Sequence, residues 1–298
     1  MFEGFTATRI QGEGVGIHAM VGGRGPALLL LHGFPQSHVI WHRVAGELAR
    51  HFTVVATDLR GYGESDAPPG LSDHSNYSKR VMAADQVAVM RALGHERFAL
   101  VGHDRGGRVA HRLAVDHPER VTRLVTLDIA PTLAMYEQTN EAFARAYYHW
   151  FWLIRPAPFP ERLISADPDF FLAQHMGTRS AGMAPFSPEA LAAYQRHLAE
   201  PARVHAMCED YRASANIDMV LDRADRDAGV GIRCPMMALW GEHGIIGKMF
   251  DPLAEWRRVS RSSVTGKSLA CGHYVPEEVP EALLGELLPF LAAGSNES

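Results

Sequence analysis

The chain has 298 residues, of which 47% are hydrophobic and 21% are charged, a balance typical of a soluble globular protein with a large core. A formal net charge of −5 and the lack of a dense Lys/Arg run argue against nucleic-acid binding. No apolar run approaches the ~20 residues of a membrane span, and the N-terminus lacks the basic and apolar blocks of a signal peptide. The three cysteines are widely spaced and imply no disulfide framework. We therefore expect a cytoplasmic protein without a nucleic-acid or membrane partner.

The first half of the chain predicts a parallel sheet. Alternation of apolar and polar residues over 1–23 predicts one or two opening antiparallel strands. Short apolar runs predict further strands at 27–31, 53–57, 97–100 and 123–127. Between them, helices are expected at 41–50 and from Ser78 to a stop at Gly94. Strands alternating with helices at this spacing indicate a doubly wound α/β fold.

The pattern changes after Pro131. The next stretch is helical and rich in aromatic residues, whereas strand character returns at 235–240 and 262–269, before a helix at 280–291. We expect an α/β core, residues 1–132 and 221–298. A helical cap, residues 133–220, is inserted after the sixth strand and acts as a lid over the active-site edge. The tail at 294–298 is expected to be disordered.

The segment Gly102-His103-Asp104-Arg105-Gly106 lies between a predicted strand and a predicted helix. It has the shape of a nucleophile elbow, usually written G-x-S-x-G, with Asp104 in place of Ser. The two glycines let the backbone make a sharp turn that lifts the side chain at the carboxyl edge of the sheet. The simpler alternative is a helix cap, because Asp is a good N-cap residue.

The remaining triad members are sought in the chain order nucleophile, acid, histidine. His273 follows the last predicted strand, where that histidine belongs. The acid has two possible positions. The loop after strand 235–240 has no Asp and offers only Glu242, whereas Asp128 ends the preceding strand of the core. We expect Asp128 to orient His273, with Glu242 as the weaker candidate; the alternative for Asp128 is a loop-capping turn.

An Asp nucleophile changes the reaction class, because a carboxylate attacks saturated carbon and forms an alkyl ester of itself. His273 would then activate a water that attacks the carboxyl carbon of Asp104. The backbone N–H groups of Phe34, in the loop after the first parallel strand, and of Arg105 would stabilise the oxyanion. Suitable substrates carry a good leaving group on sp³ carbon, as alkyl halides and epoxides do.

Two arginines narrow the substrate further. Arg105 and Arg108 are three residues apart at the start of the helix and share one face, which suits a clamp on a substrate carboxylate. Their positive charge would also keep the neighbouring Asp104 ionised by lowering its pKa. The alternative is that they are surface arginines or form ion pairs with Asp128 or Asp58.

Donors to a leaving halide are expected in the cap. His149, Trp150 and Tyr211 each offer an N–H or O–H, although aromatic residues in such a segment more often serve packing. We expect no metal and no cofactor, because the sequence has no H-E-x-x-H, no C-x-x-C and no close cluster of carboxylates.

From about His32 to Pro276 the chain resembles the fluoroacetate (haloacetate) dehalogenases of the α/β-hydrolase superfamily. The matching segments are 32–36, 102–108, 127–132, 148–151, 209–212 and 272–274. The resemblance implies a triad of Asp104, Asp128 and His273, a carboxylate clamp of Arg105 and Arg108, a halide pocket of His149, Trp150 and Tyr211, and a homodimer. Haloalkane dehalogenases carry Trp directly after the nucleophile and Asn in the His-Gly loop, where this chain has Arg105 and Phe34.

The sequence thus predicts an enzyme that converts a small halogenated carboxylic acid, such as fluoroacetate or chloroacetate, to glycolate and halide through an aspartyl ester. The alternative is an epoxide hydrolase with the same machinery, although such enzymes usually use two lid tyrosines and only Tyr211 stands in a matching segment. A ligand-binding relative without catalysis is disfavoured because no triad position is empty.

Overall fold

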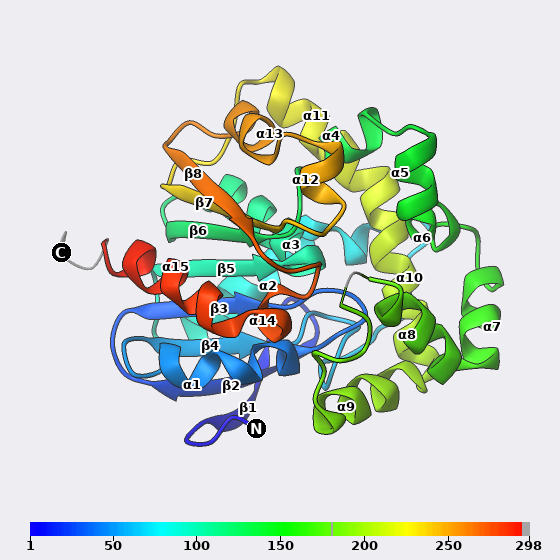
Figure 1. Cartoon of the computed structure of the whole chain (residues 1–298), viewed down its shortest axis with the longest axis horizontal. Helices are drawn as coiled ribbons and strands as arrows, with labels where there is room; N and C mark the ends of the chain where they lie inside the picture. The colour runs from blue at the N-terminus through cyan, green and yellow to red at the C-terminus, as the bar shows by residue number, and fades with distance from the viewer. Residues whose placement is uncertain (180, 294–298) are drawn as a thin grey trace.

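The computed structural model describes residues 1–179 and 181–293, so the tail expected to be disordered, 294–298, lies outside the described residues. Its centre is an eight-stranded sheet in the order β1-β2-β4-β3-β5-β6-β7-β8 (Figure 1). The strands are β1 (Thr6–Gln11), β2 (Gly16–Gly23), β3 (Ala27–Leu31), β4 (Thr53–Thr57), β5 (Phe98–His103), β6 (Val121–Leu127), β7 (Met236–Gly241) and β8 (Val264–Leu269). β2 pairs antiparallel with β1 and β4, and the other neighbours run parallel. The predicted α/β-hydrolase type of sheet is confirmed.

Strand β3 shows why an uninterrupted apolar run marks a strand here. Its five residues are all buried. Leu29 and Leu31 pack into the core on one face of the sheet, while Leu28 and Leu30 pack into the core on the other. Successive side chains of a strand point to opposite faces, so a strand covered on both sides can be apolar at every position.

Helices and short 3₁₀ turns of the α/β core cover the two faces of this sheet. They are η1 (His38–Arg43), α1 (Ala45–Leu48), η2 (Ser75–Tyr77), α2 (Lys79–Ala92), α3 (Asp104–Asp116), α12 (Ile246–Met249), α13 (Pro252–Arg258), α14 (Val275–Glu278) and α15 (Pro280–Ala292). Helix α2 begins as predicted, with the Ser78 hydroxyl accepting a hydrogen bond from the Val81 N–H, and Gly94 follows its end in a left-handed conformation. No helix of the described residues is both long and apolar enough to cross a bilayer.

Two predicted elements differ from the structure. The single helix expected at 41–50 is wrong: Ser37 caps a 3₁₀ turn that starts earlier, and only a four-residue α-helix follows it. The strand expected at 97–100 runs instead over Phe98–His103, because its last three residues still pair in register with β6. The strand therefore ends directly at Asp104.

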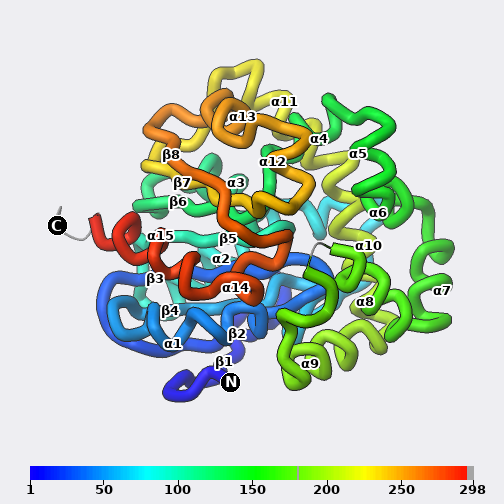
Figure 2. Tube along the Cα trace, in the orientation of Figure 1, coloured from blue at the N-terminus to red at the C-terminus, as the bar shows by residue number. Residues whose placement is uncertain are grey.

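Between β6 and β7 the described residues form a series of helices, here called the helical insertion (residues 132–227). They are α4 (Thr132–Glu137), α5 (Glu141–Ala146), α6 (Tyr148–Trp152), α7 (Phe159–Ala166), α8 (Pro168–Gly177), α9 (Pro188–Leu198), α10 (Pro201–Ala213), the π-helical turn η3 (Ser214–Asp218) and α11 (Met219–Asp227). Figures 1 and 2 show α5 to α10 gathered at one end of the sheet. The expected division of the chain into a core and a cap stays a prediction. Helix α11 runs across residue 220, where the second boundary is expected.

The helical insertion shares its core with one face of the sheet. Trp150, Tyr194 and Tyr211 belong to the same buried cluster as Leu29 and Leu100. Since the cluster is continuous, the insertion is packed onto the sheet and its side chains can reach the carboxyl ends of the strands.

Candidate active site

Asp104 sits on a sharp turn between β5 and α3. Its backbone has φ +46°, in the left-handed region that is costly for a residue with a side chain. A Cβ at Gly102 would lie 2.6 Å from the carbonyl oxygen of Gly106, and a Cβ at Gly106 would lie 2.4 Å from that of His32. Glycines are therefore needed for the close approach of strand, turn and helix. The structure shows the predicted strand–turn–helix elbow, with Asp104 at its apex.

The Asp104 carboxylate lies in a buried, positively charged setting. The Phe34 N–H donates a hydrogen bond of 3.1 Å to its Oδ1. Burial alone would raise the pKa of Asp104, but the neighbouring charges of His273, Arg108 and Arg105 together hold that pKa well below its usual value. The carboxylate is thus ionised at neutral pH, as a nucleophile must be.

His273 pairs with Asp128. Its Nδ1 lies 2.6 Å from Oδ2 of Asp128, and both side chains are buried. The other oxygen of Asp128 accepts a hydrogen bond of 2.9 Å from the Gly241 N–H at the end of β7. The alternative acid, Glu242, is exposed. The structure therefore brings Asp128, and not Glu242, to the histidine.

The loop after β7 shows why no acid is present there. A Cβ added at Gly244 would lie 3.2 Å from Oδ1 of Asp128, so Gly244 lies against the carboxylate that β6 supplies. A carboxylate side chain at that position would crowd and repel Asp128. The acid of the triad comes from the neighbouring strand, and the glycine leaves room for it.

Arg105 is anchored by the helical insertion. Its Nε and Nη2 each donate a hydrogen bond of 2.9 Å to the Asp210 carboxylate on α10. The guanidinium also lies over the Tyr211 ring, with 4.1 Å from its carbon to the ring centroid. Asp210 further pairs with Lys79 and accepts a hydrogen bond of 2.6 Å from the Tyr62 hydroxyl. These buried partners raise the pKa of Arg105 well above its ordinary value, against the opposing effect of burial.

Arg108 is held from the other side of α3. Its Nη1 donates to the Ala130 carbonyl at 3.2 Å and to the Thr132 hydroxyl at 3.0 Å. Its guanidinium lies over the Trp150 ring, with 4.5 Å from its carbon to the ring centroid. The loop after β6 and the helical insertion thus fix this cation beside the nucleophile.

Three nitrogens of this group remain without a partner. Within the part of the chain that the structure describes, Arg105 Nη1, Arg108 Nε and Trp150 Nε1 are buried and make no hydrogen bond. The expected alternative, that the arginines are surface residues or pair with Asp128 or Asp58, is wrong, because both are buried and neither bonds to those carboxylates. A buried donor left unpaired costs about 1–3 kcal/mol, and more when charged, so these atoms suit an anionic ligand.

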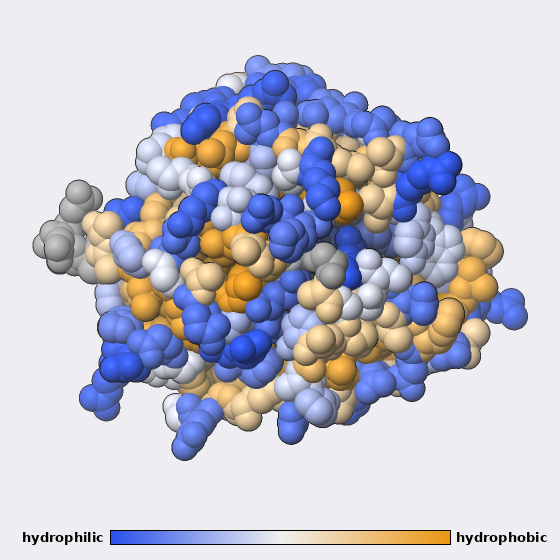
Figure 3. All heavy atoms as spheres, in the orientation of Figure 1, coloured by the Kyte–Doolittle hydropathy of each residue, from blue (hydrophilic) through white to orange (hydrophobic). Residues whose placement is uncertain are grey.

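A cavity of about 590 Å³ leads to the triad. Asp128, His149 and His273 line it, together with the cations Arg145, Arg179 and Lys248. Figure 3 shows the hydrophilic hollow on this face between α12 and the helices of the insertion. Asp128 is the one carboxylate lining residue among those described, and the cavity is consequently positive.

Two of the expected halide donors, His149 and Tyr211, lie near one another, whereas the third, Trp150, lies with its ring against Arg108. The rings of His149 and Tyr211 are 5.9 Å apart, and Tyr211 lies 5.2 Å from the ring of Phe34. Burial, with His175 nearby, lowers the pKa of His149 well below its ordinary value, so the imidazole is neutral and carries a single N–H. Burial and the charge of Asp104 raise the pKa of Tyr211, which keeps its hydroxyl protonated.

Several partners in this site were missed by sequence reasoning. Asp210 lies 105 positions after its partner Arg105 in the sequence, and His175 and Arg179 lie in the segment around α8. The segment 209–212 did stand out as a family match, but nothing in its spacing indicates an ion pair with Arg105. Only the folded chain shows these contacts.

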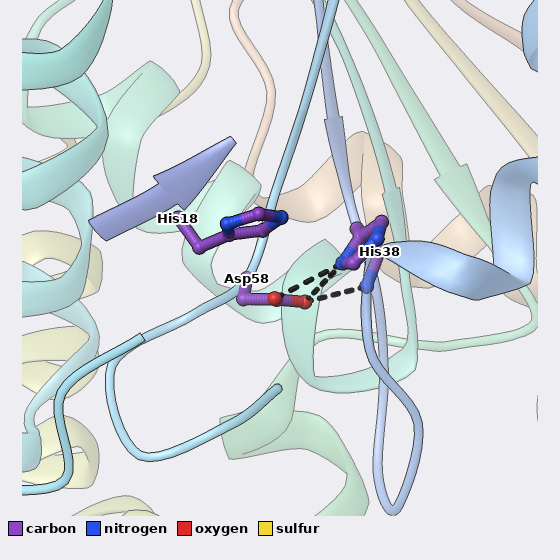
Figure 4. A group of neighbouring side chains, drawn as sticks. All are labelled: His18, His38 and Asp58. Atoms are coloured by element: carbon purple, nitrogen blue, oxygen red, sulfur yellow. Dashed lines mark hydrogen bonds and ion pairs between the residues drawn. The ribbon is translucent and has the colours of Figure 1, made fainter. Parts of the chain in front are cut away.

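A second cluster, His18, His38 and Asp58, has the composition of a metal site (Figure 4). The Asp58 carboxylate, however, already accepts hydrogen bonds from the His38 N–H at 2.7 Å and from the Glu64 N–H at 2.9 Å. The His38 Nδ1 lies a further 2.9 Å from the same carboxylate. The cluster thus joins the loop after β3 to the loop after β4 by hydrogen bonds.

Comparison with known proteins places these features in a family. The profile of the alpha/beta hydrolase fold matches residues 26–279. A fluoroacetate dehalogenase from Burkholderia sp is 46% identical over 98% of this chain and 95% of its own. A soluble epoxide hydrolase from Corynebacterium sp. (strain C12) is 32% identical over 94% of this chain and 95% of its own. The crystal structure of a Nostoc sp PCC 7120 protein is 52% identical and superposes with a TM-score of 0.95 over 98% of this chain and 99% of that one.

The Asp210 pairing predicts a large effect on stability. Asp210→Asn leaves Arg105 buried without a counter-charge and leaves Lys79 with Asp218 as its remaining carboxylate partner, and we expect it to lower the free energy of unfolding by about 3–5 kcal/mol. The measurement is urea unfolding followed by circular dichroism. The control is Glu141→Gln, which removes an exposed pair with Arg145 and should change the free energy by no more than about 0.5 kcal/mol. Equal effects of the two variants would contradict the role given to Asp210.

Proposed function

We propose that this chain, a hydrolase of the alpha/beta hydrolase family, cleaves the carbon–halogen bond of haloacetates. It shares this family with its fluoroacetate dehalogenase relative. The observation that carries the proposal is the pair of unpaired nitrogens, Arg105 Nη1 and Arg108 Nε, beside the ionised Asp104. A substrate carboxylate accepts a hydrogen bond from each guanidinium, whereas a neutral substrate leaves two buried charged donors unpaired.

In the first chemical step, an Asp104 oxygen attacks the carbon that bears the halogen. The new C–O bond forms as the C–X bond breaks, and the halogen leaves with the electron pair as halide. His149, Trp150 and Tyr211 donate their N–H and O–H groups to this halide. The product on the enzyme is an ester that joins the Asp104 carboxyl group to the carboxymethyl group of the substrate.

In the second step, neutral His273 takes a proton from water, and the resulting hydroxide attacks the Asp104 carboxyl carbon. Asp128 stabilises the imidazolium that forms. The backbone N–H groups of Phe34 and Arg105 stabilise the oxyanion, and each well-aimed donor contributes about 3 kcal/mol. Collapse of the intermediate breaks the ester, and the leaving alkoxide takes the proton from the His273 imidazolium. Glycolate leaves with the alkyl oxygen, and the Asp104 carboxyl group releases a proton to solvent, which restores the carboxylate.

Epoxide hydrolysis is the second candidate. It needs an acid that protonates the leaving alkoxide, and the sequence offers Tyr211 in a matching segment. The structure adds Tyr136, whose ring lies 4.9 Å from that of Trp150 and whose buried hydroxyl has no partner among the described residues. Burial raises the pKa of Tyr136 to about 12, so this hydroxyl is an available proton donor.

A turnover comparison separates the two functions. Purified protein is incubated with fluoroacetate, chloroacetate and styrene oxide in parallel. We expect release of halide from both haloacetates, measured with an ion-selective electrode, because the two guanidiniums pair with the substrate carboxylate. Background halide release, with diol formation from the epoxide, would instead establish the alternative.

Blocking the second step should trap the ester. His273→Asn cannot activate water, so chloroacetate should add 58 Da to the protein, the mass of a carboxymethyl group replacing a proton on Asp104. Intact-protein and peptide mass spectrometry measure the adduct and locate it. Asp104→Asn is the matched variant, which should show neither adduct nor turnover. A modified residue other than Asp104 would exclude the ester mechanism.

The halide donors predict a dependence on the leaving group. Trp150→Phe keeps an aromatic ring at this position and removes the unpaired N–H. We expect kcat to fall about 10–100-fold with fluoroacetate and less than about fivefold with bromoacetate, because fluoride depends most on hydrogen bonding as it leaves. Trp152→Phe, in the same helix, is the control and should change neither value. The same loss with both substrates would argue that Trp150 serves packing alone.

A further inference from the structure

Glu277 is a buried carboxyl group that the proposed reaction does not use. It lies on the short helix α14, four residues after His273, and its exposed fraction is 0%. Among the described residues, no Lys, Arg or His side chain bonds to its carboxyl oxygens; the nearest cation, Arg43, donates instead to its main-chain carbonyl at 2.5 Å. A buried carboxylate without a counter-charge is strongly disfavoured.

The contacts of Glu277 join three parts of the active site. Its Oε2 lies 2.5 Å from the side-chain amide of Gln36, two residues after Phe34 in the loop that bears the proposed oxyanion donor. Its Oε1 accepts a hydrogen bond of 3.1 Å from the Tyr194 hydroxyl on α9 of the helical insertion. Both α14 and α9 pack against η1, which continues the Phe34 loop. One carboxyl group therefore touches the Phe34 loop, the His273 helix and the insertion.

The contacts of Glu277 accommodate a protonated acid. The orientation of a Gln side-chain amide is assigned from its hydrogen-bond partners, so either end of the Gln36 amide can face Glu277. With the amide turned, the Glu277 O–H donates to the Gln36 carbonyl oxygen while its other oxygen accepts from Tyr194. Burial raises the pKa of Glu277 to about 8, against the smaller lowering by its two hydrogen-bond partners.

Other charged groups around Glu277 do not replace its proton. Arg43, on η1, is exposed and occupied by the main chain. Glu278 accepts a hydrogen bond of 2.8 Å from the Tyr274 N–H. Burial raises the pKa of Tyr194 and of Tyr274 far above neutral pH, so both hydroxyls stay protonated. Loss of the Glu277 proton thus leaves a buried negative charge without a counter-ion.

We propose that protonated Glu277 is a positioning residue that holds the Phe34 loop, the His273 helix and helix α9 in the arrangement needed for turnover, and that loss of its proton releases this arrangement. The residue acts through Gln36 and Tyr194 and touches no reacting atom. Its kinetic test rests on the proposed haloacetate hydrolysis, whereas its stability test does not.

The kinetic test is the pH profile of kcat/KM for chloroacetate between pH 6 and 10. The wild-type value should fall about tenfold from pH 7 to pH 9, because about ten of eleven molecules have then lost a proton that dissociates with pKa 8. Glu277→Gln keeps a donor to Gln36 and an acceptor for Tyr194, so its profile should stay within twofold over this range. Glu277→Leu should be impaired at every pH. An unchanged alkaline fall in Glu277→Gln, or no fall in the wild type, would overturn the proposal.

The stability test compares the melting temperatures of wild type and Glu277→Gln at pH 5.5 and 8.5. A carboxyl group protonated in the folded state and ionised in the unfolded state destabilises the fold as pH rises from about 4.5 to about 8, because the folded state then binds more protons. The melting temperature of Glu277→Gln relative to wild type should therefore rise by about 5 °C or more between the two pH values. Glu281→Gln, exposed on α15, should show no such change. If the difference in melting temperature between Glu277→Gln and wild type does not change with pH, Glu277 is not protonated in the folded state. This conclusion does not depend on the enzyme's substrate.

Discussion

The buried ion pair between Arg105 and Asp210 connects the two halves of this molecule at the site of chemistry. Arg105 follows the nucleophile directly in α3, and Asp210 belongs to α10 of the helical insertion. Burying such a pair is costly, and Asp210 offsets that cost by also bonding Lys79 and Tyr62. Because these partners come from the loop after β4, from α3 and from α2, the insertion is fixed to the core at the residue that faces the proposed substrate.

The same core places two buried carboxyl groups in opposite protonation states. Around Asp104, His273 and the two arginines together outweigh burial and keep the group ionised. Around Glu277, only neutral partners are present, so burial dominates and the proton stays bound. Different environments thus suit Asp104 to its proposed role as a nucleophile and Glu277 to its proposed role as a hydrogen-bond donor.

Local patterns in the sequence were enough to predict the strands, the elbow and the contact between Asp128 and His273. The run 27–31 marks β3 because both faces of the sheet are covered, and the place of Asp128 at a strand end puts it next to His273. The pairing of polar side chains was not predictable. Asp210 and Tyr194 lie on helices whose hydrophobic periodicity predicts which face is buried, but not which distant side chain that face contacts. The 3₁₀ turn η1 was missed because Ser37 starts it with a local cap.

The anchoring of Arg105 has a consequence for how substrate enters. Asp210 of the helical insertion fixes the orientation of the Arg105 guanidinium, and Trp150 of the insertion packs against the Arg108 guanidinium. The proposed carboxylate clamp therefore belongs to the elbow in sequence but depends on the insertion for its geometry. The positive cavity lined by Arg179 and Lys248 opens beside His149 and His273, where it attracts anions. A rigid clamp reached through a charged entrance favours small anions and excludes larger neutral compounds, which is the selectivity that haloacetate hydrolysis needs.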